Sequence, residues 1–500
     1  MKKITYIILI AIISAGALGC KKFLNVTPID NLSGNNYWQN EADIEKFVNG
    51  IYIKLRSRVL NNGSTFFTFA DIRCAPVVNS SNIAGFTNLI NNDLKGAIAS
   101  SNGDYYYYNF KAATEWKSYY DVIGSANIMV KEVSDMPSSA ISEETRKRYI
   151  AEGVFLRNLC YFLLVRMYGD VPYYTNAYND QPLGRTDQIA VMKRCIADMA
   201  AVKDDLPVTY VDASQVGTRA MRGAAIALMM HMNMWAAGFD NGDKTAYYQE
   251  VVKYGQELTT YADYGLLDYT VDNNKKIFKG NTKESLFEIV SNANYGEVIS
   301  QYDNPSMFFS KYPFRGTTTT TTSQMYFAVK FMQKVFPAGS GDLRRTLWFE
   351  NVDLGNNTFQ LKKFSNTYPT GTNNSISHDD SRIIFRLPDA LLLTAEAAAN
   401  LDDNTTAQTF VNKVRARAQA IPFSSTGDQL KDDIYYERVR ELFCEGHYFY
   451  DLVRTKRILN SEYSDHPIGV ADFNAGAWTW PISISALVNN PNMTLNNFWR

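Results

Sequence analysis

The stretch AEGVFLRNLCYFLLVRMYGDVP, residues 151–172, decides how this chain folds. Its apolar residues recur at helical spacing and form one broad apolar face: Val154, Phe155, Leu159, Phe162, Leu163 and Val165. We expect a helix over 143–168, ending where Gly169 allows a left-handed backbone and Pro172 cannot continue it. Glu152, Arg157 and Arg166 lie inside the apolar run. Because burying an unpaired charge is costly, we expect these side chains to be tied to carboxylates or carbonyls elsewhere.

Helical periodicity continues on both sides of this stretch. It predicts further helices over 41–60, 114–136, 187–205, 216–237 and 244–260. Neighbouring helices that are rich in alanine and aromatic residues favour TPR-like helical hairpins, although no strict 34-residue period is visible. The predicted fold class is therefore mainly α, a TPR-like helical-hairpin scaffold with long irregular loops and a few short β-strands, such as one over 285–290.

Two segments interrupt the helical pattern, 61–110 and 261–380. The first is rich in Asn, Ser and Gly and contains four consecutive tyrosines, and the second carries the polythreonine run 317–322, which we expect to be a solvated loop. Long irregular segments inside a globular protein usually carry function. We therefore assign the helical scaffold to 41–260 and 382–460, and a variable, loop-rich ligand region to 61–110 and 261–380.

The composition excludes one class of partner and leaves two interpretations of the aromatic residues. The net charge is −1 and there is no long basic run, so nothing indicates nucleic-acid binding. Aromatic residues make up 13% of the chain, with 32 tyrosines, which exceeds what a core needs. These rings fill helix–helix contacts in one interpretation and form a surface for flat ligands such as sugar rings in the other.

The first twenty residues have the pattern of a lipoprotein signal peptide. Lys2 and Lys3 precede an apolar run that is too short for a comfortable membrane span, and the run ends in Ala-Leu-Gly before Cys20. We therefore predict a signal peptide over 1–19, lipidation of Cys20, and a tether over 20–40. The alternative is an ordinary secretory signal with an incidental cysteine.

Several stretches, in order along the chain, resemble signatures of the SusD/RagB family of outer-membrane lipoproteins. They are the opening stretch, which is similar to the family's A-E-A-x-F-L-R-A…Y-G-D-V-P, and the segments 21–28, 386–397, 410–418, 434–458 and 490–494. The departures are Asn25, Gly153, Asn158 and Leu495. The resemblance implies one SusD-like domain over 41–500 with a TPR-like scaffold.

The same resemblance implies a function. Members of this family capture nutrients, mostly glycans, at the cell surface for a SusC-like TonB-dependent transporter in the outer membrane. It therefore implies a non-catalytic, oligosaccharide-binding lipoprotein, anchored to the outer membrane through its N-terminal lipid and facing outside. Two alternatives remain open, which are an exported helical-repeat scaffold that binds only protein, and a glycoside hydrolase.

Candidate sugar-contacting residues come from the composition of the two irregular segments, because the family's binding loops are variable. They are Asp71, Arg73, Asn82, Tyr105 and Tyr106 from the first segment, and Tyr302, Phe309 and Tyr312 from the second. Aromatic rings would stack on the C–H faces of sugars, and polar side chains would bond the hydroxyl groups. The alternative for each ring is packing against the helical scaffold.

A catalytic interpretation rests on Glu437, Glu441 and Glu445, which share one helix face. Two such carboxylates could approach the roughly 5–5.5 Å separation of retaining glycosidases. The interleaved Arg438 and Arg440 favour structural ion pairs instead. We further expect Arg157 or Arg166 of the opening stretch to contact a carboxylate of the second signature: Glu437, Glu441, Glu445 or Asp451.

The remaining chemistry-bearing residues predict neither a metal site nor a cofactor. The four histidines have no metal-ligand spacing, and we expect His447, which follows Gly446, to be packed and hydrogen-bonded. The cysteines after Cys20 are far apart and not in CxxC form, and those at 160 and 444 lie in apolar helices, where we expect buried thiols.

Overall fold

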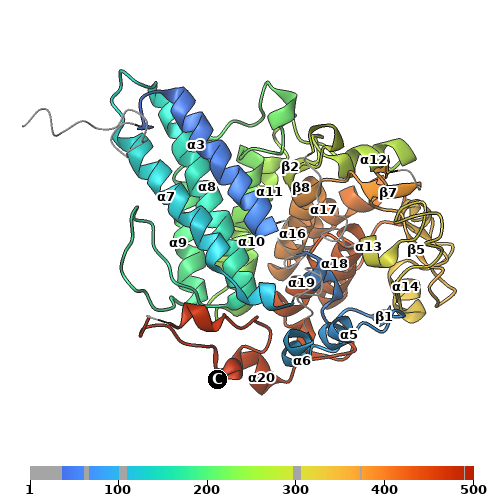
Figure 1. The fold of residues 1–500 in the computed structure, drawn as a ribbon. Helices are drawn as coiled ribbons and strands as arrows, with labels where there is room; N and C mark the ends of the chain where they lie inside the picture. Colours follow the sequence, from blue (N-terminus) through green and yellow to red (C-terminus); the bar gives the residue numbers. More distant parts are fainter. Residues whose placement is uncertain (1–36, 61–66, 101–109, 297–305, 372–373, 489) are drawn as a thin grey trace, which may run out of the picture.

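The main helices of the computed structural model pack largely as successive hairpins (Figure 1). The structure describes residues 37–60, 67–100, 110–296, 306–371, 374–488 and 490–500. The main helices are α3 (Glu41–Lys54), α7 (Lys117–Asp135), α8 (Glu143–Tyr168), α9 (Gln188–Ala200), α10 (Arg222–Phe239), α11 (Thr245–Leu258), α16 (Leu387–Asn400), α17 (Asn404–Arg417), α18 (Gly427–Glu441) and α19 (Tyr448–Arg454).

The longest helix among the described residues is α8, and its bounds are those that the sequence predicts. The Ser142 hydroxyl caps it by accepting a hydrogen bond from the Thr145 N–H at 3.1 Å, and Gly169 ends it with a φ of 73°. From Ala151 to Tyr168 every residue is buried, so the apolar face extends all round the helix. It packs on α3, α7, α9 and α10.

Three helix pairs that are adjacent in sequence pack as hairpins: α7 with α8, α10 with α11, and α16 with α17. The second and third hairpins meet where α11 packs on α16, although these helices are far apart in the sequence. Figure 1 shows α3, α7 and α8 side by side at one edge and the C-terminal helices in the middle. This arrangement confirms the predicted mainly helical, TPR-like scaffold.

The strands in the described part of the chain are short and pair in four separate two-stranded sheets. They are β1 (Val77–Asn79) with β3 (Met325–Phe327), β2 (Ser285–Ile289) with β8 (Arg382–Arg386), β4 (Phe349–Glu350) with β5 (Gln360–Leu361), and β6 (Thr367–Thr370) with β7 (Ser375–His378), all antiparallel. The β2–β8 pair places Ser285 opposite Arg386, at the start of α16. The strand expected over 285–290 is therefore present.

The two segments expected to be irregular contain more regular structure than the sequence predicts. The first holds α4 (Phe67–Ile72), α5 (Ala84–Ile90) and α6 (Leu94–Ala99), and the second holds α12 (Val271–Lys279), α13 (Ser306–Phe309), α14 (Val329–Val335) and α15 (Leu343–Trp348). These helices are too short for periodicity to reveal, and side-chain caps begin some of them, such as Asp93 on α6. The polythreonine run is a solvated loop as expected.

Short helical turns follow the scaffold at its C-terminal end, including α20 (Val470–Ala475). Among the helices of the described residues, none offers an apolar stretch long enough to cross a membrane. The predicted signal peptide and Cys20 lie outside the described residues.

Candidate ligand-binding site

Asp71 and Arg73, predicted to contact sugar, lie in the interior. One carboxylate oxygen of Asp71 accepts a hydrogen bond from the Gly446 N–H at 2.7 Å, and the Arg73 guanidinium donates to the carbonyls of Ala477 and Trp478, both at 2.8 Å. Their exposed fractions are 3% and 1%. The prediction is corrected for both residues, because α4 packs against the C-terminal region and covers them.

The other predicted contacts fall into three groups. Phe309 is fully buried and stacks on Phe327 with ring centroids 4.6 Å apart, so this prediction is also corrected in favour of core packing. Asn82 is exposed and Tyr312 is half-buried, but neither lines the cavity described next. Tyr105, Tyr106 and Tyr302 lie outside the described residues.

An aromatic cavity of about 280 Å³ opens between α14, α18, α19 and the segment 461–465. Its aromatic lining consists of Phe331, Tyr435, Tyr436, Tyr448 and Tyr463. Only Tyr435 among these is fully buried, and the others are half-buried. Three of these rings, Tyr435, Tyr436 and Tyr448, belong to the signature over 434–458, which was predicted to be scaffold, and the sequence did not predict the cavity. The signal was present in the paired tyrosines of α18, but their cavity partners come from distant segments.

Hydrogen bonds and ring contacts fix the tyrosines that line this aromatic cavity. The Tyr463 hydroxyl donates to the Asp432 carboxylate at 2.8 Å, and Arg457 pairs with the same carboxylate at 2.5 Å. The guanidinium of Arg457 lies 4.6 Å from the Tyr435 ring centroid and 5.0 Å from that of Tyr463. Tyr436 and Tyr463 are nearly parallel, with 19° between the ring planes and centroids 6.1 Å apart. A ligand therefore meets rings that are already oriented.

The rim of the aromatic cavity is polar and carries both signs of charge. Lys330 and Lys334 on α14 lie on one side, and Glu462 and Asp465 lie on the other, and all four are exposed. Burial raises the pKa of Tyr436 to about 12, with Asp432 adding to the effect, so this phenol is neutral and able to donate at pH 7. Aromatic faces with a few polar groups around them suit a polyhydroxylated ring such as a sugar.

A second, much smaller cavity of about 20 Å³ lies directly behind the aromatic cavity. Both are lined by Phe331, Val439 and Tyr448, and the inner one also meets Asp71 and His447. This volume has room for one water molecule. Burial raises the pKa of Asp71 to about 8, so its carboxyl group is mostly protonated at neutral pH.

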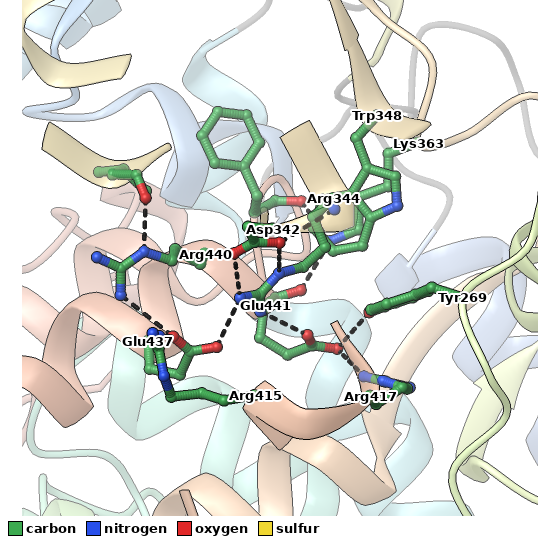
Figure 2. Close-up of polar contacts among 12 residues, drawn as sticks. Tyr269, Asp342, Arg344, Trp348, Lys363, Arg415, Arg417, Glu437, Arg440 and Glu441 are labelled. Carbon is green, nitrogen blue, oxygen red and sulfur yellow. Dashed lines mark hydrogen bonds and ion pairs between the residues drawn. The ribbon is translucent and has the colours of Figure 1, made fainter. Parts of the chain in front are cut away.

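The three glutamates of the catalytic alternative lie in a buried network of cations, and Figure 2 shows Glu437 and Glu441 among their arginine partners. Glu437 pairs with Arg344 at 2.7 Å and with Arg415 at 2.5 Å. Glu441 pairs with Arg344 at 2.9 Å and also accepts a hydrogen bond from Tyr269 at 2.7 Å. These pairs hold α15, α17 and α18 together.

Glu445 completes this network, pairing with Lys363 at 2.5 Å and with Arg386 at 2.6 Å. Burial alone would raise the pKa of all three carboxyl groups, but the surrounding cations outweigh burial and lower it. A glycosidase needs one carboxyl group with a raised pKa and substrate access to both. The expected structural ion pairs are therefore present, and the geometry does not serve hydrolysis.

The predicted carboxylate partner of Arg157 needs correction, whereas Arg166 does meet the second signature. Arg157 pairs with Asp198 of α9 at 2.8 Å instead of a carboxylate of the second signature. The Arg166 guanidinium donates to the Gly446 carbonyl at 3.5 Å and lies 3.8 Å from the Tyr450 ring centroid. The two signatures thus meet at Arg166, where the Gly446 carbonyl and the Tyr450 ring contact the guanidinium and the charge of Asp451 also acts on it. The three glutamates of the second signature are neutralised mainly by cations from other elements, such as Arg344 and Arg386 for Glu441.

Glu152 of the opening stretch is neutralised from the N-terminal half of the chain. It pairs with Arg219 at 2.8 Å and with Arg148 at 2.9 Å. Arg219 also pairs with Glu45 at 2.7 Å, so it joins α8 to α3. The expectation that the buried charges of this stretch are tied to groups elsewhere is confirmed.

The fold brings together His231, Asp389 and His447, which sequence spacing kept apart. Their donor atoms lie within 4.8 Å of one another, and His231 Nε2 lies 2.6 Å from Asp389. Arg438 also donates to Asp389, at 3.0 Å. Burial lowers the pKa of His231 and lowers that of His447 to about 3, so both rings are neutral at pH 7. The Asp389 carboxylate thus already accepts hydrogen bonds from two donors. The positive charge of Arg438 also opposes the binding of a metal cation between these three residues.

The four cysteines in the described part of the chain are free and buried. They are Cys74, Cys160, Cys195 and Cys444. Burial raises the pKa of Cys74 to about 12, so it is a protonated thiol. The expectation of buried thiols at positions 160 and 444 is confirmed.

Two family models match the chain and together cover most of it. The model described as "SusD family" matches residues 350–499, and the model described as "Starch-binding associating with outer membrane" matches residues 22–233. A solved SusD homologue from Bacteroides thetaiotaomicron is 36% identical, covers 93% of this chain and 100% of its own, and superposes with a TM-score of 0.86. The chain belongs to the SusD family.

Two further relatives of this SusD-family protein extend the comparison. A SusD-like protein of Formosa agariphila is 26% identical over 496 residues, which cover 90% of each chain. A laminarin-binding SusD-like protein is 21% identical with a TM-score of 0.69, covers 92% of this chain and 99% of its own, and shares the fold. The signatures noted in the sequence are thus those of the family.

Proposed function

We propose that this protein is a non-catalytic, cell-surface glycan-binding lipoprotein that captures an oligosaccharide at the aromatic cavity. The observation that carries this proposal is the set of oriented tyrosines, Tyr435, Tyr436 and Tyr463, with a polar rim, in a member of the SusD family. The description of the family model, starch binding in association with the outer membrane, supports it.

The proposed place of action is the outer membrane, with the protein facing outside. Cys20 would carry the lipid after removal of residues 1–19, and residues 20–40 would form the tether to the scaffold. Each buried CH₂ group of an acyl chain contributes roughly 0.8 kcal/mol to membrane binding, so a triacylated cysteine anchors the protein without a spanning helix. The captured oligosaccharide would then pass to a SusC-like TonB-dependent transporter.

Calorimetric titration of residues 21–500 with a panel of oligosaccharides tests this proposal, with chromatography of the mixture afterwards to detect cleavage. The panel should hold α- and β-glucans, plant polysaccharide fragments and host glycans. The expected result is binding of at least one class with no change in chain length. Cleavage would favour the glycoside hydrolase. Failure to bind any class, combined with tight association with a transporter, would favour a scaffold that binds only protein.

A further inference from the structure

A second pair of hollows lies where the segment between α8 and α9 meets the C-terminal segment. One hollow has a volume of about 450 Å³ and is lined by residues from 169–188 and 474–500. The other, of about 240 Å³, is lined by the aromatic rings of α7 and by residues from 172–183 and 486–493. Among the described residues, neither shares a lining residue with the aromatic cavity.

The two hollows adjoin one another. Leu183 and Met493 line the smaller hollow, and the residues that follow them in the chain, Gly184 and Thr494, line the larger one. Arg185 joins them physically, because it lines the larger hollow while its guanidinium lies 5.4 Å from the ring centroid of Trp116, which lines the smaller. One oligosaccharide can therefore reach both.

The larger hollow is polar and firmly built. Arg185 donates to the Asp170 carbonyl at 2.9 Å, to the Thr494 carbonyl at 2.8 Å and to the Asn496 side chain at 3.0 Å, so it ties the two walls together. The lining also includes Gln188, and Trp235 already donates to its side-chain oxygen at 3.0 Å. The NH₂ group of Gln188 is therefore the part of this side chain that can donate hydrogen bonds to a ligand. Amide groups donate and accept, which is what sugar hydroxyls require.

The smaller hollow offers an aromatic shelf. Tyr120 and Tyr174 are nearly parallel, with 10° between their planes and centroids 6.2 Å apart, and both are half-buried. The Tyr120 hydroxyl donates to the Pro172 carbonyl at 2.9 Å, and Trp116 packs edge-on against Tyr120 at 5.7 Å. These contacts fix the rings, and the amides of Asn179 and Asn490 lie at the same hollow.

We propose that the polar hollow and the aromatic shelf together form a second glycan-binding site, which takes a short stretch of a neutral oligosaccharide. This inference rests on the proposed function. Fixed rings beside concave, amide-lined space fit sugars, whereas the core of a protein interface is depleted in carboxylates such as that of Asp170. Two sites on one molecule would hold a polysaccharide at two points, which raises affinity for the polymer well above that for a short fragment.

Calorimetric stoichiometry with tetrasaccharides of α-1,4-glucan, β-1,3-glucan, β-1,4-mannan and β-1,4-xylan tests the second site. The variants are Tyr174→Ala for the shelf, Tyr436→Ala for the aromatic cavity, and Tyr178→Ala as the matched control. Tyr178 lies on the same loop, is 59% exposed and lines neither hollow. We expect two bound tetrasaccharides on the unaltered protein and on Tyr178→Ala, and one on each of the other variants.

The same proteins should be compared on the parent polysaccharide. Tyr174→Ala and Tyr436→Ala should each weaken the affinity for the polysaccharide by about tenfold or more, because the polymer is then held at only one of the two sites. Arg500→Ala, at an exposed residue of the polar hollow, provides a variant with little effect on folding. It should weaken the second site and leave the melting temperature unchanged.

Three results would overturn the second site. A single tetrasaccharide that is lost in Tyr436→Ala and unaffected by Tyr174→Ala and Arg500→Ala would remove it and leave the proposed function intact. Two tetrasaccharides on every variant, with transporter binding lost in Tyr174→Ala, would make the shelf a protein-docking surface. No binding of any tetrasaccharide to the unaltered protein would count against both proposals.

Discussion

At the scale of single residues, Glu441 joins more of the core than any local pattern indicates. It accepts from Arg344 at 2.9 Å, from Arg386 at 2.5 Å, from Tyr269 at 2.7 Å, and also from Arg417. Its partners come from four separate segments of the chain. The sequence predicts that such a carboxylate needs a cation, but not which cation, because the partners lie 24 to 172 residues away.

Glu441→Gln should therefore destabilise the protein strongly. It keeps the shape of the side chain but leaves buried guanidinium groups without their counter-charge, and breaking such a pair costs about 3–5 kcal/mol. Urea unfolding followed by circular dichroism measures the loss. Glu462→Gln, at an exposed residue, is the matched control and should change the free energy of unfolding by less than about 0.5 kcal/mol. Equal effects for the two variants would contradict a structural role for the network.

The raised pKa of Asp71 leads us to expect that the free energy of unfolding depends on pH. Burial raises its pKa to about 8, so the folded protein keeps this proton over a range where the unfolded chain, with an ordinary pKa near 3.9, loses it. The contribution to the free energy of unfolding is therefore fully present below about pH 4 and is lost as the pH rises towards 8.

Asp71→Asn mimics the protonated carboxyl group and should remove this pH dependence. Between pH 5 and pH 7 the unaltered protein should lose about 2–3 kcal/mol more stability than the variant, at roughly 1.4 kcal/mol per pH unit. Thermal or urea unfolding at both pH values gives the comparison. Parallel pH profiles for the two proteins would show that Asp71 is ionised in the folded state.

At the scale of elements, strongly periodic helices were predictable and short ones were not. The bounds of α8 agree with the sequence because a hydroxyl cap, a long apolar run and a terminal glycine all mark the same helix. The segments 61–110 and 261–380 carry α4, α5, α14 and α15 in their described parts, but these helices span two turns or fewer. Their stability comes from tertiary packing, which periodicity does not record.

Close packing between elements makes Gly238 of α10 irreplaceable. A Cβ atom there would lie 2.3 Å from the Arg454 carbonyl oxygen of α19, which is backbone and cannot turn away. Gly238→Ala should destabilise the protein by about 1–3 kcal/mol. Gly124→Ala in α7 is the control, because its Cβ would have nothing within 4 Å and alanine favours a helix by about 0.5–1 kcal/mol. The melting temperatures should move in opposite directions, and a shared direction would contradict the described α10–α19 contact.

The candidate site shows where prediction from sequence stops. Asp71, Arg73 and Phe309 belong to segments of the right composition, yet the fold turns them inward. Tyr436 and Tyr463 come from a scaffold helix and a C-terminal turn, and only the tertiary structure places them at the same aromatic cavity. Composition locates aromatic residues in the chain, whereas a binding surface depends on which faces the packing leaves uncovered.

At the scale of the whole molecule, the proposed lipid anchor at Cys20 would determine where the protein works. Cys20→Ala removes the residue that we propose to be acylated, so the variant should move from the membrane fraction to the soluble fraction of cells that lack the transporter. Immunoblotting of the two fractions measures this shift. Another cysteine variant, Cys160→Ser, controls for loss of a thiol that lies in the core. Retention of Cys20→Ala on such membranes would contradict the anchor.

The most direct test of glycan capture at the aromatic cavity is calorimetric titration of residues 21–500 and of Tyr436→Ala with the oligosaccharide that binds best. Tyr436 is half-buried, and none of the hydrogen bonds described above for the aromatic cavity involves its side chain. Replacing it with alanine should therefore leave the fold intact. We predict a loss of affinity of about tenfold or more, equivalent to about 1.4 kcal/mol, at this site with an unchanged melting temperature. Unchanged affinity at every site in Tyr436→Ala would contradict glycan capture at the aromatic cavity.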